Sequence, residues 1–440
     1  MKGDTSEEKD LLPRDQIFTR PFEQRFLSWY RRVFSINEVE ESLVLKFFFG
    51  AMLFVFFLGF SSWMGSRAIT LEAFKSGSYT CWPYFQSCGE WYFLSVIPYG
   101  YSQTILYMAF FGAMLLIVSL MWKRDWVLAH MLMMILFVWE VLLLLVLTGG
   151  LSGNYDYYHI FLTFVLLFVP YKMFFLKLVF VLFYFLSATV KIDDGWILGS
   201  YFTALQTGLP IFPDSVAPLV TNMVIFMQVI GAWFLMSKNK VYQRVALFYF
   251  IVFHLYSGIL VQYRYPATVL PALLILFGPL YQYTKVPLVK KTLAGWLLVI
   301  LLCIFQSIPL LISGDHKTTL EGNKYGFYMF EANHQCISDV AIYNKDGSVA
   351  TSTSESILAR NRCNPYDRWF QMNQLCQRAE DVEKIAWTFD HSINGDPFYR
   401  IVDEENVCNL EYKAFSHNEW IKTPEEGAEV IGYPVKNIYR

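Results

Sequence analysis

Three ionisable residues directly follow an apolar run near the middle of the chain. Lys191, Asp193 and Asp194 come at the end of the run Phe174–Val190, which is long enough to approach the width of a bilayer. Ionisable groups at a hydrocarbon boundary are costly and therefore often mark functional positions. Because burial disfavours the charged form of an amine, Lys191 is expected to lose its proton near neutral pH. A neutral amine at this position could serve an enzyme as a base.

Other polar residues lie within apolar runs or at their ends. Asp156 and His159 lie near the start of one run, and His254 lies in the outer part of another. Asp156 and His159 are expected at the same membrane depth as Lys191, so we expect them to reach one cavity beside it. Glu140 lies in the middle of a run, where it would be either a proton-pathway group or a protonated carboxyl bonded to a neighbouring helix.

Each candidate also has a structural interpretation. Lys191 would then be an interfacial anchor whose ammonium reaches the lipid headgroups, and Asp193 would pair with it or cap a following helix. His254 would form a hydrogen bond with a neighbouring helix. Gln228 and Gln306 are expected to form hydrogen bonds between helices.

The composition is that of an integral membrane protein. Of 440 residues, 55% are hydrophobic, 18% are aromatic and only 16% are charged, whereas soluble domains carry about a quarter charged residues. The formal net charge of −2 gives no indication of nucleic-acid binding. The sequence contains no Gly-rich phosphate loop, Ser/His/Asp set or metal-ligand spacing, so no metal is predicted.

Apolar runs close to the roughly 20 residues that cross a bilayer recur through the first three-quarters of the chain. They are apolar all round, which argues against a soluble helical core with polar faces. We therefore expect an all-α polytopic membrane bundle of about nine spans, embedded in the lipid bilayer. The predicted spans are Val44–Met64, Ser102–Trp122, Val127–Leu147, Tyr158–Pro170, Phe174–Val190, Val216–Met236, Val245–Gln262, Thr268–Tyr283 and Ala294–Ser313.

Basic residues concentrate before the first span and in alternate loops, which predicts a cytoplasmic N-terminus. With an odd number of spans, the region from Gly314 onward is then extracytoplasmic. The predicted organisation is a cytoplasmic segment over residues 1–43, a transmembrane domain over 44–313 and an extracytoplasmic domain over 314–440. The first 43 residues are too polar for a signal peptide, so the first span is expected to remain as a signal-anchor. The clustered basic residues are Arg20, Arg25, Arg31, Arg32, Lys123, Arg124, Lys172, Lys177, Lys238, Lys240, Arg244, Lys285, Lys290 and Lys291.

Six of the seven cysteines fall in segments predicted to be extracytoplasmic, and Cys303 lies inside the last span. Their confinement to the oxidising side predicts up to three disulfides. Cys81–Cys88 is a short-loop possibility, and the remaining connectivity stays open. The other four are Cys336, Cys363, Cys376 and Cys408.

The predicted extracytoplasmic domain contains no membrane-length run. Residues 340–352 alternate apolar and polar side chains around an Asp346-Gly347 turn, which predicts a hairpin. Residues 367–378 fit an amphipathic helix, and residues 385–389 and 399–402 each fit a strand. We therefore expect a small, β-rich α+β domain with a sandwich-like sheet and one helix.

Four segments match, in order, the motifs of one known family. They are Lys191-Ile-Asp193-Asp194-Gly-Trp196-Ile-Leu-Gly199, Phe253-His254 with the apolar run after it, Glu321–Met329, and Ser392-Ile-Asn394-Gly395. The corresponding family segments are Lys-Leu-Asp-x-x-Trp-x-x-Gly, Phe-His, Phe-Ser-Trp-Arg-Met and Ser-Leu-Asn-Gly. Along nearly its whole length the chain thus resembles the vitamin K-dependent γ-carboxylase family, including its bacterial homologues, the horizontally transferred transmembrane (HTTM) group.

The resemblance implies a chemistry for this site. In the family, the lysine of the first segment deprotonates reduced vitamin K, oxygen adds to the resulting anion, and the product removes a γ-hydrogen from a peptide glutamate that then captures CO2. Carried over, Lys191 is the base, and Asp193, Asp194 and His254 support it. The implied cofactor is a reduced vitamin K or menaquinol-type quinone, or another lipid-soluble substrate at the outer leaflet. An extracytoplasmic protein is the implied second substrate.

The sequence departs from the family at two segments. Where the family has Asn-His-x-Tyr, this chain has Asn154-Tyr-Asp156-Tyr-Tyr158-His159, so Asp156 replaces the histidine and His159 falls one position beyond the tyrosine. Tyr328 replaces the arginine of the Trp-Arg-Met segment. The alternative function is therefore a non-catalytic family member that binds a membrane partner or carries a lipid or small solute. A proton-coupled transporter using Glu140 ranks third, because the sequence lacks an inverted repeat.

Overall fold

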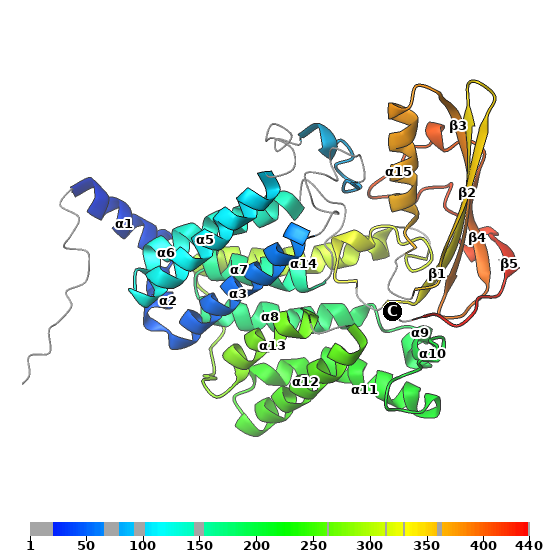
Figure 1. Ribbon diagram of the computed structural model, residues 1–440. Helices are drawn as coiled ribbons and strands as arrows, with labels where there is room; N and C mark the ends of the chain where they lie inside the picture. Colours follow the sequence, from blue (N-terminus) through cyan, green and yellow to red (C-terminus); the bar gives the residue numbers. More distant parts are fainter. Residues whose placement is uncertain are drawn as a thin grey trace, which may run out of the picture.

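A helical bundle and a C-terminal sheet domain make up the chain (Figure 1). The computed structural model describes residues 21–65, 79–91, 102–144, 154–261, 264–312, 315–328, 331–358 and 363–438. Within these residues, four helices are long and apolar enough to cross a membrane. They are α3 (Leu43–Gly65), α5 (Ser102–Trp122), α8 (Lys172–Thr189) and α14 (Leu293–Leu311).

Each of the other five predicted spans overlaps a helix in the described residues. Span Val216–Met236 is divided into an α-helix and the 3₁₀-helix η7 (Gly231–Met236). Membrane crossing by these five helices stays a prediction, and residues 145–147, 262 and 313 of the predicted spans lie outside the described part. The five helices are α6 (Trp126–Leu142), α7 (Asn154–Phe168), α11 (Ala217–Val229), α12 (Lys240–Val261) and α13 (Arg264–Phe277).

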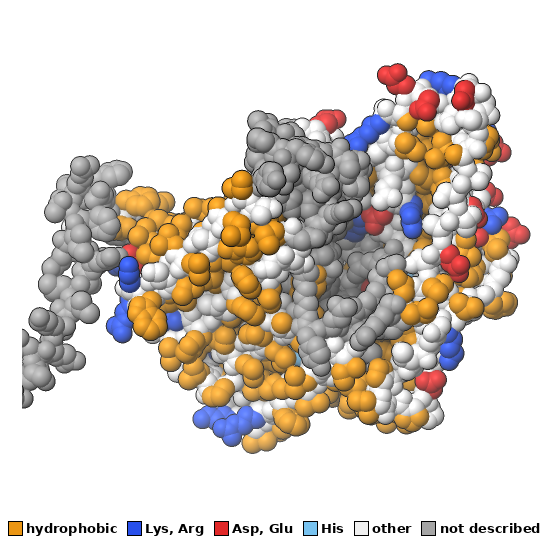
Figure 2. Space-filling view, in the orientation of Figure 1, with side chains coloured by type: hydrophobic (Ala, Val, Ile, Leu, Met, Phe, Trp, Pro, Cys, Tyr) orange, Lys and Arg blue, Asp and Glu red, His pale blue; other side chains and the backbone are white. Residues whose placement is uncertain are grey.

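The surface of the molecule agrees with a membrane-embedded bundle. On the face shown in Figure 2, hydrophobic side chains cover the helices, whereas acidic side chains gather on the C-terminal domain. Large apolar side chains such as Leu115, Phe248 and Leu311 are among the most exposed of the bundle. In water such a surface would be unfavourable, and in a bilayer it is the expected one.

The helical run is interrupted between α7 and α8 at Pro170, where the predicted span Tyr158–Pro170 ends. Helix α7 ends at Phe168, and α8 begins at Lys172 after Tyr171 has adopted a left-handed conformation with a φ of 58°. Glu38, in α2 (Ile36–Glu41), accepts hydrogen bonds from the backbone N–H groups of Tyr171 and Lys172, each at 2.7 Å. A carboxylate at this helix N-terminus satisfies donors that have no partner within the helix.

Helix α8 lies at the centre of the bundle. It packs against α7, α11, α13 and α14, and nearly all of its side chains are buried. Its apolar run therefore faces protein and not lipid along most of its length. The C-terminal end of this buried helix leads directly into Lys191.

The C-terminal domain is one antiparallel sheet with a helix on one face (Figure 1). The predicted hairpin is confirmed, with Tyr343 paired to Val349 around a turn in which Gly347 has a φ of 81°. The predicted sandwich-like arrangement is wrong, because all five strands join a single sheet in the order β2-β1-β3-β4-β5. The elements are β1 (His334–Asn344), β2 (Val349–Ser356), α15 (Pro365–Arg378), β3 (Val382–Ile393), β4 (Phe398–Glu404) and β5 (Glu429–Gly432).

Six cysteines form three pairs at disulfide distance, as predicted in number. Their Cα–Cα distances are 5.6 Å for Cys81–Cys88, 5.8 Å for Cys336–Cys363 and 5.6 Å for Cys376–Cys408. The first pair is the short loop predicted from the sequence. The other two join β1 to the segment before α15, and α15 to the 3₁₀-helix η10 (Val407–Asn409). They therefore tie α15 to the rest of its domain near both of its ends.

Candidate functional site

The turn after α8 folds the Lys191 side chain back over the last turn of that helix. The Lys191 ammonium nitrogen donates to the backbone carbonyl of Ser187 at 2.7 Å. Asp193 then starts the short helix α9 (Asp194–Ile197), and its side chain accepts a hydrogen bond from the Trp196 backbone N–H at 3.2 Å. The close succession of two helix ends thus holds Lys191 at the boundary of the bundle.

Lys191 is almost completely enclosed, with 4% of its surface exposed. Besides the Ser187 carbonyl, its Nζ contacts the Gln228 Oε1 at 3.3 Å and lies 5.5 Å from the centre of the Trp196 ring. Among the described residues, no carboxylate lies within ion-pair distance of this amine. Burial lowers the pKa of Lys191 to about 7, against the opposing effect of the Glu331 and Asp193 carboxylates.

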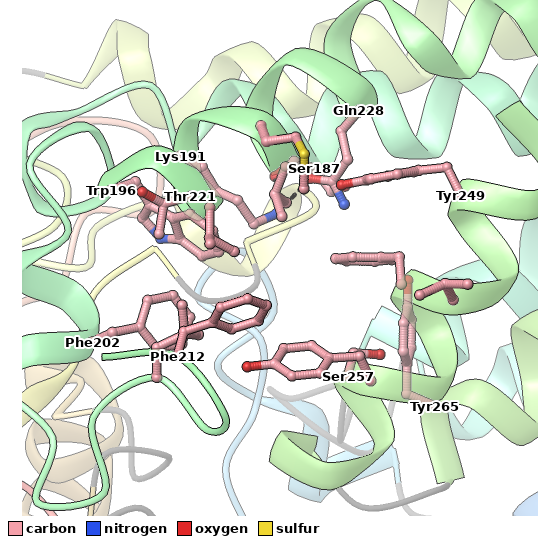
Figure 3. Close-up of a pocket in the computed structure, with 17 residues that line it drawn as sticks. Ser187, Lys191, Trp196, Phe202, Phe212, Thr221, Gln228, Tyr249, Ser257 and Tyr265 are labelled. Atoms are coloured by element: carbon pink, nitrogen blue, oxygen red, sulfur yellow. Dashed lines mark hydrogen bonds between the residues drawn. The ribbon is translucent and has the colours of Figure 1, made fainter. Parts of the chain in front are cut away.

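A cavity of about 200 Å³ lies beside this amine (Figure 3). In Figure 3, Lys191 and Gln228 meet near one end of the cavity, and Trp196 and Phe202 lie across it from Tyr249 and Tyr265. Of the seventeen described residues that line it, Lys191 is the only one that carries a charge. The full lining is Ser187, Lys191, Trp196, Phe202, Leu209, Phe212, Val220, Thr221, Met223, Val224, Gln228, Tyr249, Val252, Phe253, Tyr256, Ser257 and Tyr265.

The two aspartates after Lys191 shape the turn and do not line the cavity. Asp193 caps α9 and forms an ion pair with Lys317, from the segment that follows α14. Asp194 is the first residue of α9 and is exposed. The predicted support of Lys191 by these carboxylates is therefore positional, together with the electrostatic effect of Asp193 on its pKa.

His254 lies one layer behind the cavity. It is completely buried on α12, its Nε2 is hydrogen-bonded to the Tyr184 hydroxyl, and its ring centre lies 5.4 Å from that of Tyr265. Its Nδ1 has no hydrogen-bond partner among the described residues. Tyr265 and Phe253, whose rings contact that of His254, line the cavity and separate His254 from it.

Asp156 and His159 do not reach this cavity, contrary to the expectation of one shared site. The His159 Nδ1 lies 2.8 Å from the Glu140 Oε1, and its Nε2 lies 3.2 Å from the Met52 carbonyl. Tyr158 of α7 contacts the cavity residue Tyr265, with ring centres 5.9 Å apart. One residue further along a helix turns by about 100°, which points His159 toward α3 and α6.

The contacts of His159 locate one proton. A carbonyl only accepts, so the Nε2 that faces Met52 carries a hydrogen. The short contact between Nδ1 and Glu140 then holds one further proton, either on the carboxyl or on the imidazole. Both arrangements are neutral overall. The contact with α7 agrees with the second interpretation of Glu140 in its bond to a neighbouring helix, and the predicted proton on the carboxyl stays a prediction.

Two of the lining residues have a signal in the sequence. Ser187 precedes Lys191 by one helical turn, and Gln228 is one of the few polar residues in its apolar run. Gln228, expected to link helices, does so by accepting from the Lys191 amine. Tyr249 and Tyr265 have no such signal, because aromatic residues make up 18% of the chain.

The C-terminal domain contacts the turn that follows Lys191. The Asn394-Gly395 turn between β3 and β4 has φ angles of 52° and 86°, and the Asn394 side chain packs on Gly195, where a Cβ atom would have no room. Asn394 is held in return by Asn333, whose backbone N–H donates to its Oδ1 at 2.9 Å and whose carbonyl accepts from its N–H at 2.9 Å. The first and fourth segments of the family resemblance therefore meet in space.

The C-terminal domain also forms hydrogen bonds with residues 201–206, a few residues further along the chain. The Asn333 side chain donates to the Tyr201 carbonyl. Near the end of the chain, the Asn437 N–H donates to the Ala204 carbonyl and its carbonyl accepts from the Gln206 N–H, both at 2.9 Å. Trp196 and Phe202 belong to residues 195–206, the segment that the C-terminal domain contacts. The C-terminal domain therefore positions one wall of the cavity.

The third segment of the resemblance packs against the end of α8 from the other side. Gln306 of α14 donates to the Leu186 carbonyl at 3.2 Å and accepts from the Phe327 backbone N–H at 2.6 Å. The Phe327 ring lies 4.5 Å from that of Phe183. Tyr328 is buried, with its ring 5.7 Å from that of His316. Met329 lies outside the described residues.

The chain matches no known family model, no curated protein and no solved structure. Its function therefore has to be inferred from the geometry of the site. That geometry is a buried amine without a carboxylate partner in the described residues, beside an apolar cavity that is lined by the bundle and has one wall held in place by the C-terminal domain.

Proposed function

We propose that this chain is an integral membrane enzyme in which Lys191 is the general base toward an acidic hydroxyl group of a lipid-soluble aromatic substrate. A reduced naphthoquinone, as in the γ-carboxylase family, is the substrate class. The observation that carries the proposal is the position of the Lys191 amine, which is buried, bonded to neutral acceptors and directed at an apolar cavity. A metal is not needed for this step.

The energetics of the proton transfer are reasonable in such a cavity. A phenolic hydroxyl has a pKa of about 10, whereas burial lowers the pKa of Lys191 to about 7. A difference of about three pKa units costs about 4 kcal/mol. The attraction between the resulting ammonium and phenolate about 4 Å apart is also about 4 kcal/mol at an effective dielectric constant of about 20. The ion pair therefore offsets most of the cost of forming it.

Neighbouring groups would stabilise the charged product. When Lys191 accepts the proton, the electron pair of the broken O–H bond stays on the substrate oxygen. The ammonium keeps its acceptors, the Ser187 carbonyl and the Gln228 side chain, and lies over the Trp196 ring. The family chemistry then continues with oxygen adding to the substrate anion, which yields an epoxide.

The placement in the cell follows the same proposal. The N-terminus is cytoplasmic, and the C-terminal domain lies on the extracytoplasmic side, where its paired cysteines find an oxidising environment. A protein substrate would approach from that side. Carboxylation of its glutamates depends on the resemblance alone, because Asp156 replaces the family histidine and does not line the cavity.

The test is turnover of a reduced naphthoquinone by the purified full chain in lipid nanodiscs, with the epoxide measured by chromatography. We expect Lys191→Met to lower turnover by about 100-fold or more, the usual contribution of a general base. The matched control is Lys177→Met, which removes another buried amine that bonds to a carbonyl, that of Gln282, but lies outside the cavity lining. Equal turnover in the wild type and Lys191→Met would remove Lys191 as the base.

The second candidate is a non-catalytic carrier of a lipid or small solute, or a partner-binding subunit. It is favoured by the separation of Asp156 and His159 from the cavity. A carrier would bind the naphthoquinone without converting it. Saturable binding with no epoxide formed by the wild type would favour this candidate.

A further inference from the structure

The cavity lies between two helices along several turns. Helix α11 contributes lining residues from Val220 to Gln228, and α12 contributes lining residues from Tyr249 to Ser257. Eight residues of helix correspond to about 12 Å. The cavity is therefore an elongated space between α11 and α12, with the Lys191 amine against its wall.

The same two helices carry an apolar outer surface. On α11, Leu219, Met223 and Phe226 are exposed at helical spacing, and on α12 the exposed residues include Phe248 and Val252. Of these exposed residues, Met223 and Val252 also line the cavity. With 50% and 48% of their surfaces exposed, they lie on the inner and the outer surface at once.

A third residue has the same double position. Phe212, in the loop before α11, lines the cavity and is 40% exposed. The edge of the cavity is thus apolar on all three of these elements. An opening bordered by such residues faces the hydrocarbon of the membrane and not water, provided that α11 and α12 are embedded as proposed.

We propose that Met223 and Val252 border a lateral opening through which the hydrocarbon tail of an amphiphile passes from the cavity into the bilayer. The head of this amphiphile is a small uncharged aromatic group that lies against Lys191 and Gln228. The inference rests on the proposed function for the identity of the head, and it adds the route and the residues that select the tail.

The size of the cavity indicates that only part of a lipid ligand fits inside it. Pockets that enclose a drug-sized ligand measure about 300–1,000 Å³, whereas this cavity measures about 200 Å³. It has room for a ring system but not for a long tail as well. The tail of any lipid bound here must therefore lie outside the cavity.

The charges of the lining argue for an uncharged head. Lys191 is the only charged residue among those that line the cavity, and its protonated form is disfavoured by burial. A phospholipid head would bring a phosphate into this space with at most one amine to balance it. A phenol or quinol head requires only hydrogen-bond partners, which Lys191, Gln228 and Thr221 can supply.

The test compares one ring with and without a tail. The full chain in nanodiscs is titrated with radiolabelled 2-methyl-1,4-naphthoquinone, and the same ring bearing a long isoprenoid tail is used as competitor. We expect the wild type to prefer the tailed compound by about tenfold or more at equal concentration per lipid. Met223→Trp and Val252→Trp fill the opening and should reduce that preference to about twofold. The preference is the ratio of two affinities measured in the same variant, so it is read separately from any change in the affinity for the ring itself.

A matched control separates the opening from a general effect of bulk. Leu219→Trp places the same side chain on the exposed surface of α11, at a residue that does not line the cavity, and should keep the full preference. A thermal midpoint close to that of the wild type shows that each variant is folded.

Each outcome bears on one of the two proposals. Equal binding of both compounds by the wild type, or a full preference in Met223→Trp and Val252→Trp, would overturn the lateral opening while leaving Lys191 chemistry intact. A tail preference that these variants abolish, in a protein that forms no epoxide, supports the opening and overturns the proposed enzyme. Failure of either compound to bind the wild type would overturn both.

Discussion

Lys191 and the Glu140–His159 pair are both buried in the bundle, but their surroundings differ. Glu140 and His159 pair with each other across α6 and α7, with the remaining ring nitrogen on Met52 and the ring packed 4.3 Å from that of Phe56. The second carboxyl oxygen, Glu140 Oε2, has no hydrogen-bond partner among the described residues. Lys191 has neutral acceptors, no carboxylate partner among the described residues, and a cavity beside it. The pair joins two helices, whereas an amine facing open space is available to a substrate. Burial of an ionisable group therefore indicates function only together with space beside it.

The largest expected effect separates the two sites by activity. Lys191→Met should lower turnover by about 100-fold or more without lowering the thermal midpoint, because it removes an amine that is costly to bury and leaves no charged partner behind. Glu140→Gln should keep turnover within about threefold, because it touches no part of the cavity. Parallel turnover and thermal-unfolding measurements test both. A strong activity loss in Glu140→Gln would show that the two sites act together.

The second prediction concerns the free energy of unfolding, which should depend on the contact between Glu140 and His159. Glu140→Leu leaves the His159 Nδ1 buried without a partner and should lower the free energy of unfolding by about 1–3 kcal/mol. Glu140→Gln can donate to the same nitrogen and should cost less than about 1 kcal/mol. Denaturant titration of the two variants in matched micelles measures the difference. Equal stability of Glu140→Leu and the wild type would contradict the assignment of the pair as a link between helices.

A smaller effect is expected where the C-terminal domain grips the Lys191 turn. The added Cβ of Gly195→Ala would displace the side chains of Asn394 and Asp193, which are held by Asn333 and Trp196, and should cost about 1 kcal/mol for the hydrogen bonds lost. Turnover should fall severalfold as the cavity wall shifts. Gly112→Ala is the control, since a Cβ there meets no atom within 4 Å. Similar turnover and stability for both variants would exclude a role of this grip.

A pH dependence should also be confined to Lys191. Under the proposed mechanism the neutral amine is the active form, so turnover should rise about tenfold per pH unit below pH 7 and level off above it. For stability, the unfolded chain binds more protons at this lysine than the folded chain between about pH 7 and its ordinary pKa of 10.5, so the free-energy cost of burying this lysine falls as the pH rises through that window. Lys191→Met should remove this dependence of the thermal midpoint. A midpoint with the same pH dependence in wild type and Lys191→Met would contradict it.

Local signals in the sequence located most elements of the fold. The apolar runs, the break at Pro170 and the Asp346-Gly347 hairpin were predictable because each depends on residues within a few positions of one another. The alternation of basic loops and the grouping of cysteines likewise anticipated three pairs, although only Cys81–Cys88 could be proposed. Strand β5 and the single-sheet topology were not predictable, since they depend on pairing between distant segments.

The sequence by itself determined that Lys191 ends an apolar helix and that an amine there would be costly to charge. The tertiary structure alone decided that Asp193 pairs with Lys317, that Asn394 rests on Gly195, and that His159 turns away from the cavity. The physical reason is that apolar pattern sets which residues leave water, whereas the rotation of each helix about its axis sets which side chains meet. That rotation is fixed by contacts between segments far apart in the chain, and these contacts cannot be predicted from short sequence patterns.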